Sequence, residues 1–312
     1  MTLLLSKRAI AATAALCAQA TLAAEPADDF TPVIETSDVD LFYRLYEAAD
    51  GAPSAETLQT DYIDAGSEGL KALARRRRVD GARIAEAVEK RPRLYEKARD
   101  CANVLPAAKA RLEDALRQLR TIYPEARFPA VTIAVGRGKP VGIGYPDTGV
   151  QIGLEAMCAA AFLNPDIEDR FVHVIAHEFV HVQQSPALGA KIEDGEPTVL
   201  DVSLQEGVAE FVGELISGDI AYGSLRGDVA GREAEIERAF LADKDKTDLS
   251  VWVYNSTPDA PGDLGYWVGY RIARAYHRNA EDKRQAIREL LETDDPDAIL
   301  EASGWRPGVI LD

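Results

Sequence analysis

The segment from Phe171 to Val182 is apolar on nearly every side, yet it contains His177-Glu178-Phe179-Val180-His181. A helix that is apolar all round must be buried. Positions i and i+4 of a helix share one face, so the two imidazoles can reach a single metal ion. Buried polar groups are costly unless they are paired or bind metal. The segment therefore predicts a buried metal-binding helix. The alternative is a buried histidine–glutamate hydrogen-bond network without a metal.

A second motif, Gln205-Glu206-Gly207-Val208-Ala209-Glu210, provides a third metal ligand. A catalytic zinc takes three protein ligands and keeps a fourth position open. We expect His177, His181 and Glu206 to bind Zn²⁺. Glu210, one turn further on, would accept a hydrogen bond from a ligand imidazole and fix its tautomer. Glu178 would lie where it can act as the general base toward a metal-bound water.

These two motifs resemble those of the gluzincin metallopeptidases, whose third ligand is a glutamate in an EGxAE-like helix. Three other segments are similar to a little-studied bacterial family of predicted zinc-dependent proteases, namely Asp61–Ser67, Tyr123–Pro129 and Gly149–Glu155. The similarity covers most of the mature chain. It implies a zincin-like metallopeptidase core, with a small sheet beside the HExxH helix, and a peptide or protein as the substrate.

We therefore predict a secreted or periplasmic zinc-dependent peptidase in which Glu178 is the general base. The sequence does not separate an endopeptidase from an aminopeptidase. A second hypothesis is a non-catalytic zinc- or peptide-binding envelope protein that retains the fold. The presence of Glu178 argues against it, since a binding module has no need of a general base. A third hypothesis is a structural helical envelope protein in which HExxH is accidental; metal content would distinguish it.

Four further side chains have candidate roles at the site. Tyr266 is the first candidate to stabilise an oxyanion and Tyr270 the second, although both could simply pack helix against helix. Glu155 resembles in its placement the glutamate that binds the substrate's free amine in gluzincin aminopeptidases. Its alternative is a carboxylate at a helix start. His173, one turn before His177, is predicted to be a hydrogen-bonded core or supporting histidine.

Residues 1–24 are typical of a secretory signal, with Lys7 and Arg8 before the short apolar stretch 9–22. An N-terminal membrane anchor is the alternative, but the apolar stretch is short and rich in alanine. A lipoprotein attached through Cys17 fits poorly, because Leu16 stands where a small residue is expected. The mature protein is therefore expected in the periplasm or outside the cell.

The chain is strongly acidic, and loss of Lys7 and Arg8 with the signal takes its formal net charge from −17 to −19. Such a surface argues against nucleic acid and anionic membranes as partners. No later segment is long and apolar enough to span a membrane. The basic run at 75–78 is interpreted as a solvated helix face. Cys101 and Cys158 could pair in an oxidising compartment or remain two buried thiols.

The predicted fold class is α+β and mostly helical. Residues 25–128 form a helical N-terminal region, and residues 129–312 form the metal-binding catalytic region, joined to it in one continuous domain. Residues 130–135 and 149–154 read as strands, with a Gly- and Pro-rich loop between them from Gly136 to Thr148. Val150–Leu154 is the candidate edge strand for a substrate backbone.

Overall fold

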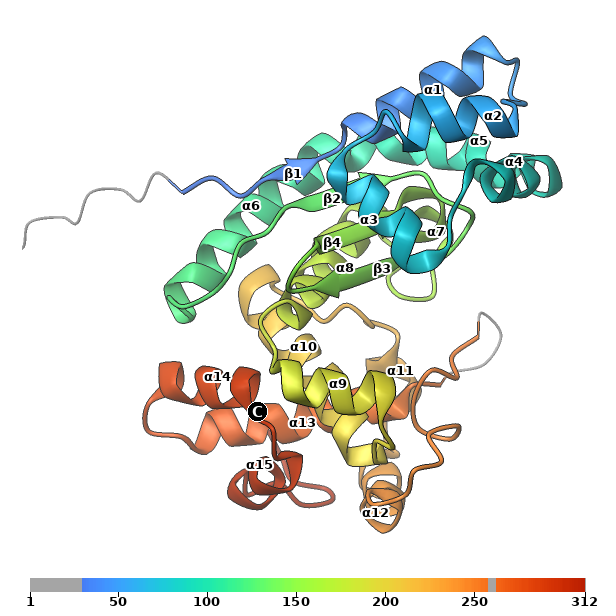
Figure 1. The fold of residues 1–312 in the computed structure, drawn as a ribbon. Coiled ribbons are helices and arrows are strands. Elements are labelled where there is room, and N and C mark those ends of the chain that lie inside the picture. Colours follow the sequence, from blue (N-terminus) through green and yellow to red (C-terminus); the bar gives the residue numbers. More distant parts are fainter. Residues whose placement is uncertain (1–29, 258–261, 312) are drawn as a thin grey trace, which may run out of the picture. The chain divides into compact units, whose positions relative to one another are not determined.

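Helices form most of this computed structural model, which describes residues 30–257 and 262–311 (Figure 1). The predicted signal, residues 1–24, lies outside the described residues. The N-terminal part contains α1 Ser37–Ala48, α2 Ala55–Thr57, the π-helical η1 Leu58–Ile63, α3 Glu68–Arg77, α4 Gly81–Lys90, α5 Pro92–Cys101, the 3-10 turn η2 Ala102–Val104 and α6 Leu105–Ile122. The later part contains α7 Leu154–Ala159, α8 Ile167–His181, α9 Pro186–Asp194, α10 Val199–Ser217, α11 Leu225–Val229, α12 Glu233–Asp243, α13 Leu264–Asn279, α14 Lys283–Glu292 and α15 Pro296–Ala302.

One small mixed sheet accompanies the helices, so the predicted mostly helical α+β class is confirmed. Its strands are β1 Ile34–Glu35, β2 Val131–Ala134, β3 Gly142–Tyr145 and β4 Gly149–Gly153, in the spatial order β1-β2-β4-β3. β1, β2 and β4 run parallel, whereas β3 pairs antiparallel with β4.

The sheet corrects two expectations drawn from the sequence. The segment predicted as a loop contains β3, and the predicted edge strand Val150–Leu154 corresponds to β4, which is paired on both sides. β3 is instead the edge strand on this side of the sheet, and β1 is the edge strand on the other. The two glycines of β3 weaken the strand preference of Ile143 and Tyr145, and pairing with β4 through Ile143 and Gln151 determines its conformation.

The metal-motif helix α8 begins directly after Asp166. The Asp166 side chain accepts a hydrogen bond from the Asp169 backbone amide at 2.9 Å, which caps the first turn. The apolar side chains that follow, including Phe171 and Phe179, are buried in the core that α8 shares with the neighbouring helices. Burial all round α8 is thus a consequence of its apolar composition.

Helix α10 carries the second motif and touches α13 backbone to backbone. A Cβ on Gly207 would lie 2.0 Å from the carbonyl carbon of Gly269, and a Cβ on Gly269 would lie 1.7 Å from the Ser203 carbonyl oxygen. Only glycine leaves room for so close a crossing. α10 itself starts with a capping box between Thr198 and Asp201. These contacts fix the position of the helix that presents Glu206.

The two cysteines of the described chain are paired. A disulfide joins Cys101 at the end of α5 to Cys158 in α7, which decides between the two alternatives left by the sequence. The described residues from Thr31 to Leu311 form one compact unit. Among the described residues, no helix has both the length and the apolar character needed to cross a membrane.

Candidate metal centre

Three side chains converge between α8 and α10. The Nε2 atoms of His177 and His181 are 3.0 Å apart, and Glu206 Oε2 lies 3.3 Å and 3.2 Å from them, respectively. A tetrahedral zinc with bonds of about 2.0–2.1 Å holds its ligand atoms about 3.3 Å apart. The triangle formed by these three atoms therefore has nearly the size that zinc requires.

The ligand cluster is shielded from water. His177 and Glu206 are 3% and 6% exposed, and His181 is only partly exposed. Burial alone would lower the pKa of His177, but the carboxylates of Glu210 and Glu206 outweigh that effect and raise it well above its ordinary value. Burial would likewise raise the pKa of Glu206, but His181 and His177 lower it strongly. The donor set thus favours a positive charge at its centre, which suits a divalent cation.

Each ligand imidazole is held through its other nitrogen. His177 Nδ1 lies 2.9 Å from Glu210 Oε1; the contact is off the line of an ideal hydrogen bond, but neither atom has another partner among the described side chains. His181 Nδ1 lies 2.7 Å from Gln184 Oε1, and the Gln184 amide donates to the Gln205 carbonyl oxygen. Both Nε2 atoms are consequently left for a metal.

Glu210 is itself fixed by the backbone. Its second oxygen accepts hydrogen bonds from the amides of Ala221 and Tyr222 at 2.8 and 3.4 Å. Glu210 therefore lies beside Nδ1 of His177, the imidazole of a predicted metal ligand. Gln184 was missed, although its position three residues after His181 brings it back toward the end of α8.

Glu178 faces the edge strand β3. A Cβ on Gly142 would lie 2.8 Å from Glu178 Oε1, and a Cβ on Gly144 would lie 2.0 Å from the Glu178 carbonyl oxygen. The two glycines let β3 lie directly on α8 at this residue. Burial raises the pKa of Glu178, while the neighbouring imidazoles oppose the shift. Glu178 is thus beside the ligand set without belonging to it.

Tyrosine rings form one wall of the centre. Tyr266 stacks parallel to His177, with ring centroids 6.2 Å apart, and Tyr222 lies 4.8 Å from Tyr266. The Tyr254 hydroxyl donates a hydrogen bond to Glu206 Oε1 at 3.3 Å. The backbone of Tyr254 is left-handed, with φ of 57°, and the residue is 62% exposed. Sequence reasoning missed Tyr222 and Tyr254, since no helical or strand spacing links them to the motifs.

The remaining sequence candidates lie outside this cluster. Tyr270 donates to Glu214 Oε2 at 2.8 Å, so it points to a different set of partners than Tyr266 does. Glu155 is fully buried, and its carboxylate accepts hydrogen bonds from the amides of Gly136 and Gly138. His173 Nδ1 lies 2.8 Å from Ser217 Oγ, as expected of a hydrogen-bonded core histidine.

The comparisons with known proteins point to a different relationship from the expected one. The family model of the gliding motility protein GldB matches residues 233–307, which run from α12 past α15. No curated protein and no solved structure matches the chain. The GldB match lies C-terminal to both metal motifs.

This match overturns the assignment to the gluzincin metallopeptidases or to a zinc-dependent protease family, and with it the expected function as a peptidase and its protease terms. The family that matches is that of GldB and not a protease family. The peptidase assignment was wrong because the HExxH and EGxAE-like motifs indicate only how ligand side chains are spaced on two helices. Ligand spacing alone does not identify a reaction or a substrate.

Proposed function

We propose that this chain is a zinc-binding protein of the cell envelope whose metal centre is formed by His177, His181 and Glu206. One observation carries the proposal: three buried ligand atoms lie 3.0–3.3 Å apart on two helices that packing holds in place. The contacts of Glu210 and Gln184 with the two imidazoles support it, because metal-binding histidines commonly have such partners.

The location rests on independent features. The Cys101–Cys158 disulfide is suited to an oxidising compartment, and the first 24 residues have the pattern of a secretory signal. The GldB match over residues 233–307 agrees with an envelope protein. We place the mature chain in the periplasm or outside the cell. We also infer a zincin-like core, on the ground that the sheet's edge strand β3 lies along the metal helix α8 at Glu178.

A second candidate function is a catalytic metal centre. Structural zinc sites are usually closed by four protein ligands, whereas three converge here among the described residues. Zinc, when bound, lowers the pKa of a coordinated water. The Glu178 carboxylate lies beside the ligands and would accept a proton from it. A panel of chromogenic ester and phosphoester substrates tests this candidate, with Glu178→Gln as the inactive control.

The principal test is metal analysis of the purified protein by mass spectrometry. We expect one zinc per chain in the parent protein and its loss in His181→Ala. The matched control is His277→Gln, because His277 of α13 packs near Phe211 of α10 and does not belong to the ligand cluster. A parent protein that stays free of zinc after incubation with the ion and desalting would rule out the proposed site.

A further inference from the structure

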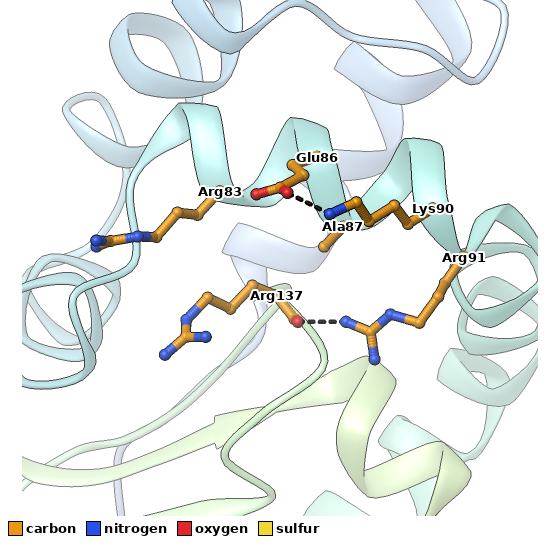
Figure 2. A pocket seen from close by; sticks show the side chains of 6 residues that line it. All are labelled: Arg83, Glu86, Ala87, Lys90, Arg91 and Arg137. Atoms are coloured by element: carbon orange, nitrogen blue, oxygen red, sulfur yellow. Dashed lines mark hydrogen bonds and ion pairs between the residues drawn. The ribbon is translucent and has the colours of Figure 1, made fainter.

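A basic pocket lies between α4 and the loop that follows β2. It has a volume of about 260 Å³ and shares no residue with the metal-binding cluster. Figure 2 shows its lining, with the α4 side chains on one side and Arg137 across from them. The lining residues are Arg83, Glu86, Ala87, Lys90, Arg91 and Arg137. Four cations against one carboxylate is unusual in a chain whose formal net charge is −17.

The one carboxylate of the lining is already neutralised. Glu86 forms an ion pair with Lys90, one turn away on α4. Arg83 is paired with Asp80 at 3.3 Å. Arg91 and Arg137 are therefore the two cations of the lining without a carboxylate in hydrogen-bonding contact, although the buried Glu155 carboxylate under the loop offsets part of the Arg91 charge.

Arg91 and Arg137 donate only to main-chain oxygens. Arg91 Nη2 donates to the Arg137 carbonyl oxygen at 2.5 Å, as Figure 2 shows, and Arg137 Nη2 donates to the Arg77 carbonyl oxygen at 3.2 Å. Neither guanidinium is ion-paired with a carboxylate of a described residue. Arg137 Nε is buried and has no hydrogen-bond partner among the described groups. An N–H without a partner is costly, so the Arg137 guanidinium has unused hydrogen-bonding capacity where it lines the pocket.

The loop that carries Arg137 is held from both sides. Below it, the fully buried Glu155 carboxylate accepts hydrogen bonds from the amides of Gly136 at 3.0 Å and Gly138 at 2.6 Å. On the other side, the Arg91 guanidinium lies against Gly138, where an added Cβ would come within 2.3 Å of it; Gly138 also has φ of +87°. Glu155, a candidate for substrate binding in the sequence, thus serves to fix this loop and to keep Arg137 in place.

We propose that this pocket binds an anion that carries phosphate groups, with Arg137 and Arg91 as its principal contacts. A guanidinium presents several N–H donors in a planar fork that matches two phosphate oxygens. A preformed loop lowers the cost of arranging those donors. The same chemistry is offered by a soluble phosphate compound and by the headgroup of an anionic phospholipid, so the test must separate these two sources.

The test uses the full mature chain at low salt. Binding of inorganic pyrophosphate is measured by calorimetry, and binding of vesicles is measured by sedimentation, with phosphatidylcholine alone or mixed with phosphatidylglycerol. Because a hydrogen bond to a charged group contributes about 1.5–3 kcal/mol, we expect Arg137→Gln to weaken binding about 10-fold or more. Arg91→Gln should act in the same direction. The control is Arg288→Gln, which removes one positive charge at an ion pair with Glu125 elsewhere.

Thermal unfolding of each variant verifies that it is folded. Pyrophosphate binding that Arg137→Gln weakens and Arg288→Gln leaves unchanged supports a soluble phosphate ligand. Binding confined to vesicles with phosphatidylglycerol, with the same dependence on Arg137, supports a lipid headgroup. The proposal fails if folded parent protein binds neither probe, or if Arg288→Gln weakens binding as much as Arg137→Gln does.

Discussion

His177 Nδ1 and Glu210 Oε1 lie 2.9 Å apart, while the other nitrogen of the same ring faces Glu206 at 3.3 Å. One imidazole therefore connects two glutamates that are one turn apart on α10. Glu206 is placed to contact a metal directly, and Glu210 is placed to orient the ring that contacts it. This division of roles follows from the helical repeat of α10 against α8.

Replacement of Glu206, Glu210 or Glu214, which share one face of α10, should weaken zinc binding less the farther the residue lies from the proposed metal centre. Loss of a supporting side chain commonly weakens metal binding ~10–100-fold, so we expect Glu210→Ala to fall in that range and Glu206→Ala to exceed it. Glu214→Ala should stay near the parent, because Glu214 contacts Arg226 and Tyr270 instead. Chelator competition at fixed pH measures the series. If Glu210→Ala proves the most damaged, Glu210 is the ligand.

Zinc affinity should decline as the pH falls. In the metal-free protein, Glu210 and Glu206 raise the pKa of His177 against the effect of burial, and Glu206 likewise raises that of His181. Protons therefore occupy these rings at a higher pH than the usual value of about 6.5, and they compete with the ion. Calorimetric titrations with zinc across a pH series measure the effect. Affinity that is flat from neutral to mildly acidic pH would contradict this expectation.

Zinc should also stabilise the folded chain. A ligand that binds only the native state adds about 2.7 kcal/mol when its concentration is 100 times the dissociation constant. The unfolding temperature should rise with added zinc and fall with a chelator. Glu206→Ala should show little of this response, whereas His277→Gln should respond as the parent does. An equal response in Glu206→Ala would place the stabilising ion at another site.

The glycines of β3 should differ in their tolerance of a methyl group. Gly144→Ala brings a Cβ to 2.0 Å from the Glu178 carbonyl oxygen, which cannot move without distorting α8. Gly142→Ala brings one to 2.8 Å from the Glu178 carboxylate, which can turn aside. Overpacking commonly costs about 1–3 kcal/mol, so we expect Gly144→Ala to reach the upper end and Gly142→Ala to lose less.

Gly189→Ala is the control for these two substitutions. Gly189 lies in α9, and nothing would lie within 4 Å of an added Cβ. Alanine is preferred over glycine in a helix by about 1 kcal/mol, so this variant should be neutral or slightly more stable. Denaturant unfolding compares all three with the parent. Equal stability of Gly144→Ala and Gly189→Ala would mean that β3 does not lie against α8 as described.

Reduction of the Cys101–Cys158 disulfide should destabilise the protein. The bridge closes a loop across 57 residues, and a native disulfide commonly contributes about 2–4 kcal/mol by restricting the unfolded chain. Urea unfolding with and without a reducing agent measures the difference. The double variant Cys101→Ala/Cys158→Ala should match the reduced parent and show no response to the reducing agent. A response in that variant would have a cause other than this bridge.

The part of the site that depends on local spacing was predictable. His177, His181, Glu206 and Glu210 are positioned by the repeat of two helices, and the apolar residues around them indicated burial. Tyr254, a loop residue with a left-handed backbone, donates a hydrogen bond to Glu206. Such a long-range contact leaves no periodic pattern in the sequence.

The strand β3 and the family assignment show the same limit of prediction from local sequence. β3 is a strand only because β4 lies beside it, and its glycines are explained by contact with α8. Glu155 was assigned a role from its distance along the chain, but the fold turns its carboxylate toward the loop after β2. The peptidase assignment failed because ligand spacing is shared among proteins with different functions, and the GldB match lies outside both motifs.

The close crossing of Gly207 and Gly269 joins helix α10 of the metal centre to helix α13 of the segment that matches GldB. Glu206 is the immediate neighbour of Gly207, and Gly269 lies within the segment that matches GldB. The two backbones touch there without intervening side chains, so the position of α10 depends on that of α13. A larger side chain at either glycine would push the two helices apart and so displace the helix that carries Glu206.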